Sequence, residues 1–146
     1  DGLLLLAVES QGQIIGFARL YPDRGHAYGH QAGNVGIALL RSYRSIGIGA
    51  IILRGLIACA AELDYSVLTA NILESNIRSR RLFSRCGFRE VNSRSVFLVF
   101  INDHANELYC EMQMSRLREV SQRELSDQQE HDQSNAAATG NCQSFQ

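Results

Sequence analysis

The stretch RSIGIG, residues 44–49, combines residue types that bind anions. Gly47 and Gly49 stand one residue apart, directly before a long apolar run that predicts a helix. A helix begins with unpaired backbone N–H groups and the positive end of its dipole, so an anion can bind there if the backbone is accessible. Glycine removes the β-carbon that would block this approach, and Arg44 and Ser45 can add donors. The stretch therefore predicts a pyrophosphate site, or else a tight turn that needs glycine for its geometry alone.

Two familiar nucleotide-binding motifs do not occur in the chain. No GxGxxG is followed by an acidic residue about 20 positions later, and there is no GxxxxGK[ST]. All 14 basic residues are arginine. The absence of lysine excludes Schiff-base chemistry on a lysine and a phosphate loop built around one.

Several titratable side chains near this stretch could transfer a proton. His26 and His30 share a polar loop with Asp23, and histidine ionises near neutral pH. Glu74 follows a buried apolar run. We expect His30, His26 or Glu74 to have a catalytic role; the alternatives are solvated loop histidines and a carboxylate that favours a helix dipole. Because no cysteine or carboxylate pairing supports the i, i+4 spacing of the histidines, no metal site is predicted.

Alternating strands and helices must position these residues. A hairpin turning at Gly12 is followed by a third strand, a helix, and a further strand, an order that favours a parallel crossover. Ser75 or Asn76 opens a second helix, which Gly87 closes. Two last strands turn at NDHAN, residues 102–106, and Tyr109 on the second either packs or reaches the site. The predicted strands are 3–8, 13–20, 34–40, 65–73, 95–101 and 107–114, and the first helix is 47–63.

The first predicted helix carries an apolar face at steps of three and four residues. Gly55 within it costs about 1 kcal/mol against alanine, and the sequence offers no reason for it. The residues of this face are Ile48, Ile51, Ile52, Leu56, Cys59 and Leu63.

Composition limits the class of protein. With 146 residues, 45% of them hydrophobic, the chain can bury one domain-sized core. A net charge of -1 does not favour nucleic acid, and no apolar run is long enough to span a membrane. The four cysteines have no close pair, which fits reduced thiols in the cytoplasm. We expect a domain over residues 1–114 and a polar, mostly disordered tail over 115–146 with a helical start at 116–125.

Two motifs together resemble one known family. YRSIGIG, residues 43–49, resembles the [R/Q]xxGx[G/A] acyl-CoA loop of the GNAT superfamily of N-acetyltransferases, and NIRSRRLFSRCGF, residues 76–88, resembles its second signature. The resemblance covers roughly residues 3–114. It implies an α/β (α+β) fold: a mixed, mostly antiparallel central sheet with a splayed strand pair and flanking helices. It also implies that the family's first strand and helices are missing before residue 1, which leaves 3–6 as an exposed apolar edge.

The resemblance also implies a cosubstrate and the residues that hold it. Acetyl-CoA would donate the acyl group. Backbone amides along the loop would bind the pyrophosphate, with Arg44 closing its first turn, and the strand before the loop would bind the pantetheine arm and direct an N–H at the thioester oxygen. Asn76 would meet the pantetheine or cap the second helix. The remaining residues implied are Ile37, Ala38, Leu39, Ser45, Ile46, Gly47, Ile48 and Gly49.

The reaction implied is direct attack of a primary amine on acetyl-CoA. Many relatives place a glutamate base where this chain has Asn34, and a tyrosine acid where it has Phe83; neither residue can transfer a proton. We expect transfer to a small-molecule amine such as an amino sugar, polyamine or amino acid. The alternatives are transfer to a protein N-terminus or side-chain amine, and a non-catalytic acyl-CoA-binding module. The sequence leaves open whether the chain forms a homodimer.

Overall fold

The computed structural model describes residues 2–114, apart from the side chain of His30. The predicted tail lies outside these residues. Strands and helices follow one another in the predicted order. Their bounds are β1 (Leu4–Ser10), β2 (Gln13–Pro22), η1 (Gly29–Gln31), β3 (Ala32–Leu39), η2 (Arg41–Tyr43), α1 (Ile48–Glu62), β4 (Val67–Leu73), α2 (Ile77–Arg85), β5 (Arg89–Leu98) and β6 (Asp103–Gln113).

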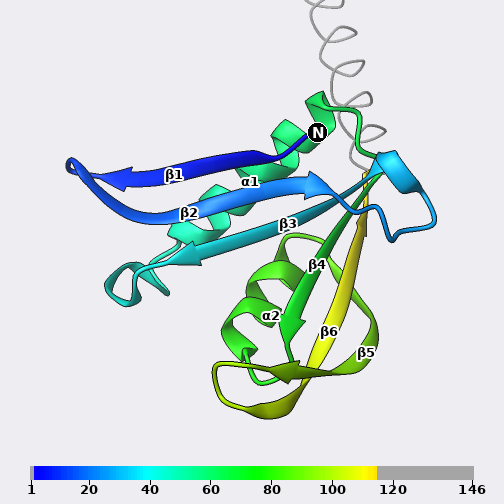
Figure 1. The fold of residues 1–146 in the computed structure, drawn as a ribbon. Helices are drawn as coiled ribbons and strands as arrows, with labels where there is room; N and C mark the ends of the chain where they lie inside the picture. The colour runs from blue at the N-terminus through cyan, green and yellow to red at the C-terminus, as the bar shows by residue number, and fades with distance from the viewer. Residues whose placement is uncertain (1, 115–146) are drawn as a thin grey trace, which may run out of the picture. The chain divides into compact units, whose positions relative to one another are not determined.

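The strands form one six-stranded sheet in the order β1-β2-β3-β4-β6-β5. Every neighbouring pair is antiparallel except β3 and β4, which are parallel and joined through α1. A parallel pair needs a long crossover connection, and the apolar helix between them supplies it. The prediction of a mixed, mostly antiparallel sheet is confirmed, and Figure 1 shows β3 and β4 diverging from a shared end.

The hairpin at the start of the chain turns where the sequence predicts it. Ser10 pairs with Gln13, and the two residues between them, Gln11 and Gly12, both have positive φ. Such turns match the twist of the flanking strands. β1 is an edge strand of the described sheet, and its Leu5 and the preceding Leu3 are exposed, as expected.

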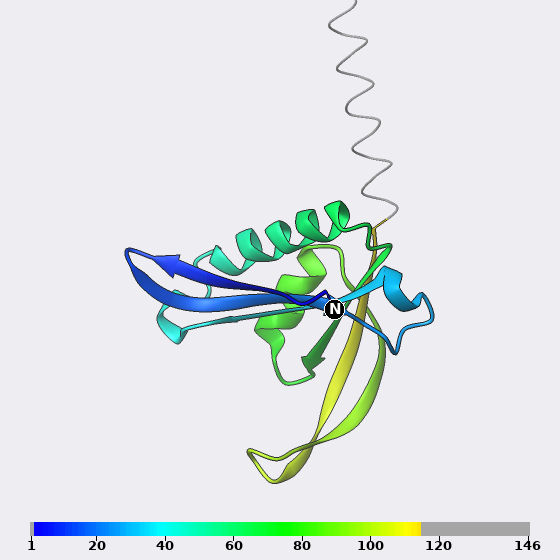
Figure 2. The same cartoon turned by 45° about the horizontal axis from the view of Figure 1, so that its top comes forward.

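Both helices pack on the same face of the sheet (Figure 2). Leu53, Leu56 and Ala60 of α1 are fully buried against alternate residues of the strands and against Phe83 of α2. The predicted apolar face of α1 is therefore partly wrong. The periodicity places Ile51 and Leu63 on it, but both are exposed, because the side of α1 that meets the sheet is centred on Leu53 instead.

Helix α2 is closed at both ends by the residues that the sequence indicates. The Asn76 side chain accepts a hydrogen bond from Ser79 N–H at 3.2 Å, which caps the first turn. Gly87 has φ +98 at the other end, and Phe88 N–H donates back to Phe83. The rings of Phe83 and Phe88 then meet edge to face, 5.0 Å apart.

The predicted position of the turn in the last hairpin is wrong. The sequence predicts a turn at 102–106, but the chain turns at 99–102, and β6 already begins at Asp103. The alternation of Leu108, Cys110 and Met112 into the core sets the register of β6, and β5 pairs to it from Arg89 onward. This register leaves the apolar residues at 99–101 in the exposed turn.

The opposite face of the sheet carries a group of polar side chains. Strand residues there alternate with those that pack against the helices, and no helix among residues 2–114 packs on this face. Its side chains include Asn34, Thr69, Asn71, Tyr109 and Glu111. None of the described helices is long and apolar enough to cross a lipid bilayer.

Candidate active site

A cleft opens where β3 and β4 separate. The two strands pair only at Ala32–Val67, Gly33–Leu68 and Asn34–Thr69. Beyond that point β3 stays paired with β2 as far as Leu39, and β4 stays paired with β6 as far as Leu73. The cleft has a volume of about 330 Å³ and is lined by residues from these strands and α2, among them Phe17, Arg19, Asn34, Ile37, Ala38, Asn71, Asn76 and Phe83. We call it the splay cleft. The edge of β3 that faces it is free to bind a ligand through its backbone.

The 44–49 loop follows η2 and runs into the first turn of α1. Arg44 Nε donates to the carbonyl of Leu39 at 2.8 Å, which fixes the loop to the strand. Ser45 and Gly47 have positive φ values of 64° and 92°, and α1 begins at Ile48. The N–H groups of residues 45–49 donate to no other atom of the described chain. Several unpaired donors at a helix N-terminus are what a bound phosphate requires.

The two glycines of this loop have different structural reasons. A β-carbon on Gly47 would meet no atom within 4 Å, so its glycine is required by the left-handed backbone and leaves open space beside the loop. A β-carbon on Gly49 would lie 3.1 Å from Leu82 Cδ2 of α2. Gly49 is therefore explained by close packing between the helices, whereas the sequence had suggested access for an anion at both positions.

A chain of hydrogen bonds lies at the closed end of the splay cleft. The Asp23 carboxylate accepts from Thr69 Oγ1 at 2.7 Å and from the Tyr109 hydroxyl at 3.1 Å. Asn34 Nδ2 donates to Thr69 Oγ1 at 3.0 Å and to Asn71 Oδ1 at 3.4 Å. Burial, together with the negative charge of Asp23, raises the pKa of the Tyr109 phenol to about 12. Tyr109 therefore stays protonated and donating at neutral pH.

Of the two histidines predicted to be catalytic, His26 has both ring nitrogens in contact with a hydrogen-bond partner. His26 Nδ1 accepts from Tyr28 N–H at 3.1 Å, so the hydrogen of a neutral ring sits on Nε2, which lies 3.0 Å from Glu111 Oε1. The ring also stacks on Tyr28. The His30 side chain lies outside the described atoms. A proton-accepting role for either histidine stays a prediction.

Glu74 follows β4 at the end opposite Asn34. Its Oε2 accepts from Asn106 Nδ2 at 2.9 Å, and it does not line the splay cleft. Glu74 lies five positions after Thr69 along extended chain, a span of about 16 Å. Its catalytic role also stays a prediction, without geometric support at the closed end of the cleft.

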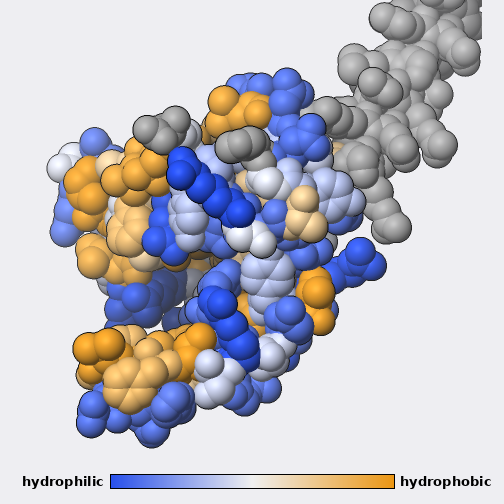
Figure 3. Space-filling model, turned by 45° about the vertical axis from the view of Figure 1, so that its right-hand side comes forward, coloured by the Kyte–Doolittle hydropathy of each residue, from blue (hydrophilic) through white to orange (hydrophobic). Residues whose placement is uncertain are grey.

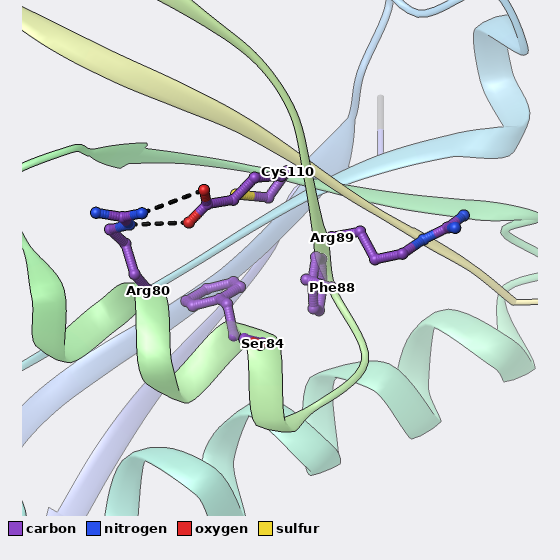
Figure 4. A pocket seen from close by; sticks show the side chains of 7 residues that line it. Arg80, Ser84, Phe88, Arg89 and Cys110 are labelled. Carbon is purple, nitrogen blue, oxygen red and sulfur yellow. Dashed lines mark hydrogen bonds and ion pairs between the residues drawn. The ribbon is translucent and has the colours of Figure 1, made fainter.

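A second pocket lies on the helix side of the sheet, with Phe83 in the wall that it shares with the splay cleft. Arg80 donates to both carboxylate oxygens of Glu90, at 2.8 and 3.2 Å. Figure 4 shows this ion pair at one side of the pocket, with Arg89 extending away from it. Burial raises the pKa of the Cys110 thiol at its floor.

Sequence reasoning missed part of the cluster at the closed end. Thr69 and Asn71 lie within a strand read only as buried, and Glu107 only as a strand residue. The signal that could have found them is the two-residue alternation of 67–73, which puts both polar side chains on one face. Among residues 2–114, no three metal-ligating side chains come together.

Sequence comparison identifies the family. Residues 1–88, more than half of the chain, match the profile of the acetyltransferase (GNAT) family. The chain therefore belongs to the acetyltransferase (GNAT) family. Acetyl-CoA is the acyl donor in this family, so the predicted enzyme class and donor are confirmed. Comparison with curated proteins gave no match.

Solved structures of the same family share the fold. The ribosomal-protein-alanine N-acetyltransferase of Brucella melitensis is 26% identical with a TM-score of 0.70, over 77% of this chain and 70% of that one. The protein yncA of Salmonella typhimurium, solved with its cofactor acetyl-CoA, is 21% identical with a TM-score of 0.70, over 77% and 65%. A chimera of the spermidine N-acetyltransferase SpeG of Vibrio cholerae is 15% identical with a TM-score of 0.68, over 78% and 68%. These likenesses confirm the fold class.

Proposed function

We propose that this chain transfers an acetyl group from acetyl-CoA to a primary amine bound in the splay cleft. The observation that carries the proposal is the open β3 edge leading to a helix N-terminus with unpaired N–H groups. A pantetheine arm binds an unpaired strand edge, and a pyrophosphate binds such a terminus. The same elements, in the same order, form the resemblance in the sequence.

Each part of the chain then has a role in binding the donor. The N–H groups of residues 45–49 bind the pyrophosphate, and Arg44 holds their loop against β3. Backbone groups of residues 37–39 bind the pantetheine, and one N–H polarises the carbonyl. Asn76 caps α2 and lines the cleft, so the two roles considered for it are compatible. When bound, acetyl-CoA supplies the thioester carbon that the amine attacks.

The acceptor amine is the less defined partner. We infer a small-molecule amine, because the cleft is small and partly polar. A protein N-terminus is the second candidate, and it is favoured by the 26% identity to the ribosomal-protein-alanine N-acetyltransferase of Brucella melitensis. An ammonium must lose a proton before attack, and an N-terminal amine, with its pKa near 8, loses it more readily than an amine with a pKa near 10.

A turnover assay tests the proposal and separates the acceptors. The purified chain is incubated with acetyl-CoA and, separately, with a peptide starting with alanine, with spermidine and with free amino acids, and release of the CoA thiol is followed. Turnover with any amine supports the enzyme and excludes a non-catalytic binding module. A chain that is folded by circular dichroism, binds acetyl-CoA and turns over no amine in this set would overturn the proposal.

Gly47→Glu tests the pyrophosphate site directly. A carboxylate in the open space beside the loop repels the phosphates, so we expect the affinity for acetyl-CoA to fall by at least about tenfold in calorimetric titration. Gly12→Glu is the matched control, since Gly12 also has positive φ and open space around it but lies in the β1–β2 turn. Equal affinities for the two variants would contradict the assignment.

A further inference from the structure

We propose that Asn34 positions the acceptor amine through its side-chain oxygen, and that Asp23 and Glu107 fix the orientation of its amide. This inference rests on the proposed acetyl transfer to an amine. It assigns a function to the position where many relatives carry a base and this chain carries an amide. Asn34 is a hydrogen-bond acceptor for the substrate here, and Asp23 is a positioning residue that acts through it.

The position of Asn34 in the fold makes such a contact available. It belongs to the last β3–β4 pair, Asn34–Thr69, so it lies where the strands begin to separate. The residue is 5% exposed and lines the splay cleft. An amine that enters from the cleft therefore meets this side chain at the closed end.

The first constraint on the amide comes from Asp23. An ionised carboxylate can only accept hydrogen bonds, so the single hydrogen of the Thr69 hydroxyl is donated to Asp23 Oδ2, at 2.7 Å. Thr69 Oγ1 can then only accept from Asn34, which must present Nδ2, at 3.0 Å. The Tyr109 hydroxyl donates to the same Asp23 oxygen and holds it in place.

The second constraint comes from Glu107 on the other side. Its Oε2 accepts from Asn71 Nδ2 at 3.0 Å and from Arg94 Nη2 at 2.7 Å. Asn71 must therefore turn its Oδ1 toward Asn34, and the distance to Asn34 Nδ2 is 3.4 Å. The hydrogen bonds thus run outward from Asn34 to a carboxylate at each end, and both carboxylates require Asn34 to donate through Nδ2.

In this arrangement Asn34 Oδ1 is the acceptor to which no described residue donates. Both hydrogens of Nδ2 are directed at Thr69 and Asn71, and no donor among residues 2–114 reaches Oδ1. Within the described residues no buried polar side-chain atom lacks a partner, so this oxygen keeps access to the cleft. A carboxamide oxygen accepts an N–H of an amine or ammonium but does not take its proton at neutral pH. It can therefore hold the amine nitrogen in the orientation needed for attack. In a direct transfer, such positioning supplies a large part of the rate enhancement.

The test reverses the direction of the hydrogen bonds that join residue 23, Thr69 and residue 34. In Asp23→Asn the new amide can donate to Thr69, whose hydroxyl can then donate to Asn34 Oδ1 and occupy the acceptor. In Asn34→Asp a carboxylate oxygen faces Thr69 Oγ1 and Asn71 Oδ1 with no hydrogen between them, so the side chain is displaced from the position in which it presents an oxygen to the amine. We expect each single variant to raise the KM for the amine by about tenfold or more, while the affinity for acetyl-CoA stays within about twofold.

The double variant distinguishes an effect of hydrogen-bond direction from a general loss of structure at the closed end of the cleft. With Asp23→Asn and Asn34→Asp together, residue 23 donates to Thr69 and Thr69 donates to residue 34, so one oxygen at position 34 is again free for the amine. We expect its KM to recover to within about threefold of the original chain. Asn92→Asp, the same change on the exposed part of β5, controls for the added charge.

The outcomes separate this inference from the proposed function. If the unmodified chain binds acetyl-CoA but acetylates no amine, the proposed function fails, and the inference fails with it. If the unmodified chain is active and Asp23→Asn leaves the amine KM unchanged, only the inference fails. Additive losses in the double variant, measured on protein with the original circular dichroism spectrum, would also overturn it.

Discussion

Tyr109 is the residue whose ionisation depends most clearly on the fold. Its hydroxyl donates to Asp23, and burial followed by the Asp23 charge raises its pKa to about 12. The folded chain therefore holds this proton over a pH range in which an unfolded chain, with a phenol pKa near 10, releases it. The ionisation of this phenol therefore makes the free energy of unfolding depend on pH in the alkaline range.

We expect stability to fall between pH 10 and about 12, in part through Tyr109. Below pH 10 both states keep the proton, so the contribution is fully present; above it, only the unfolded state releases the proton and gains stability. Because the chain has no lysine, tyrosine and cysteine are the side chains that titrate in this window.

Urea unfolding at about pH 9 and about pH 11.5 measures the loss. Tyr109→Phe should lose less stability between the two pH values than the unmodified chain, although it is less stable at pH 9. Tyr43→Phe is the control, since its hydroxyl has no hydrogen-bond partner within residues 2–114. Identical losses for the Tyr109 and Tyr43 variants would contradict the assignment.

At this scale the sequence predicted the geometry of the 44–49 loop better than the contacts between polar side chains. The backbone of RSIGIG could be predicted because glycine and a following helix determine it locally. The cluster of Asp23, Thr69 and Tyr109 depends on contacts across the sheet, more than 40 residues apart in sequence. No local pattern encodes such contacts, so Asp23 and Tyr109 could only be named as lesser candidates.

At the scale of elements, α1 carries one residue that its structure does not require. Gly55 lies in the middle of the helix on its exposed side, and a β-carbon there would meet no atom within 4 Å. Its backbone is helical, unlike that of Gly47. Nothing in the described structure explains why glycine stands at this position.

Gly55→Ala should therefore stabilise the chain by about 1 kcal/mol, because alanine loses less backbone entropy in a helix. Gly47→Ala, at φ +92, should destabilise it by about 1 kcal/mol. Urea unfolding of the two variants measures both effects. If Gly55→Ala destabilised the chain, the assignment of position 55 to an exposed part of α1 without neighbouring atoms would be wrong.

Elements with strong local signals were predictable, and the last hairpin was not. Both helices and the first turn were found because caps, glycines and periodicity mark them. The apolar run at 95–101 predicts a strand, yet β5 begins at Arg89 and the last three residues of that run lie in a turn. Register across the sheet is set by the partner strand, and a single segment does not contain it.

At the scale of the described domain, apolar side chains gather at the end of the β5–β6 hairpin. Phe97, Val99, Phe100 and Ile101 are all exposed, and Val99 and Phe100 most of all, at 82% and 78%. Figure 3 shows an apolar patch at this end of the domain, separated by a hollow from a second one above it. An apolar patch on a projecting hairpin is a common site of self-association.

Replacing Val99 and Phe100 together by serine should reduce concentration-dependent self-association without loss of fold. The two side chains bury almost nothing, so the free energy of unfolding should change by no more than about 0.5 kcal/mol. Sedimentation velocity at two concentrations measures association, and acetyl-CoA titration should give an unchanged affinity because neither residue lines the splay cleft. The exposed Arg89 on the same hairpin, changed to serine, is the matched control. If the double variant associates as strongly as the unmodified chain, this patch does not mediate association. The edge strand β1 then becomes the surface to change next, since its Leu5 and Leu6 and the preceding Leu3 are also exposed.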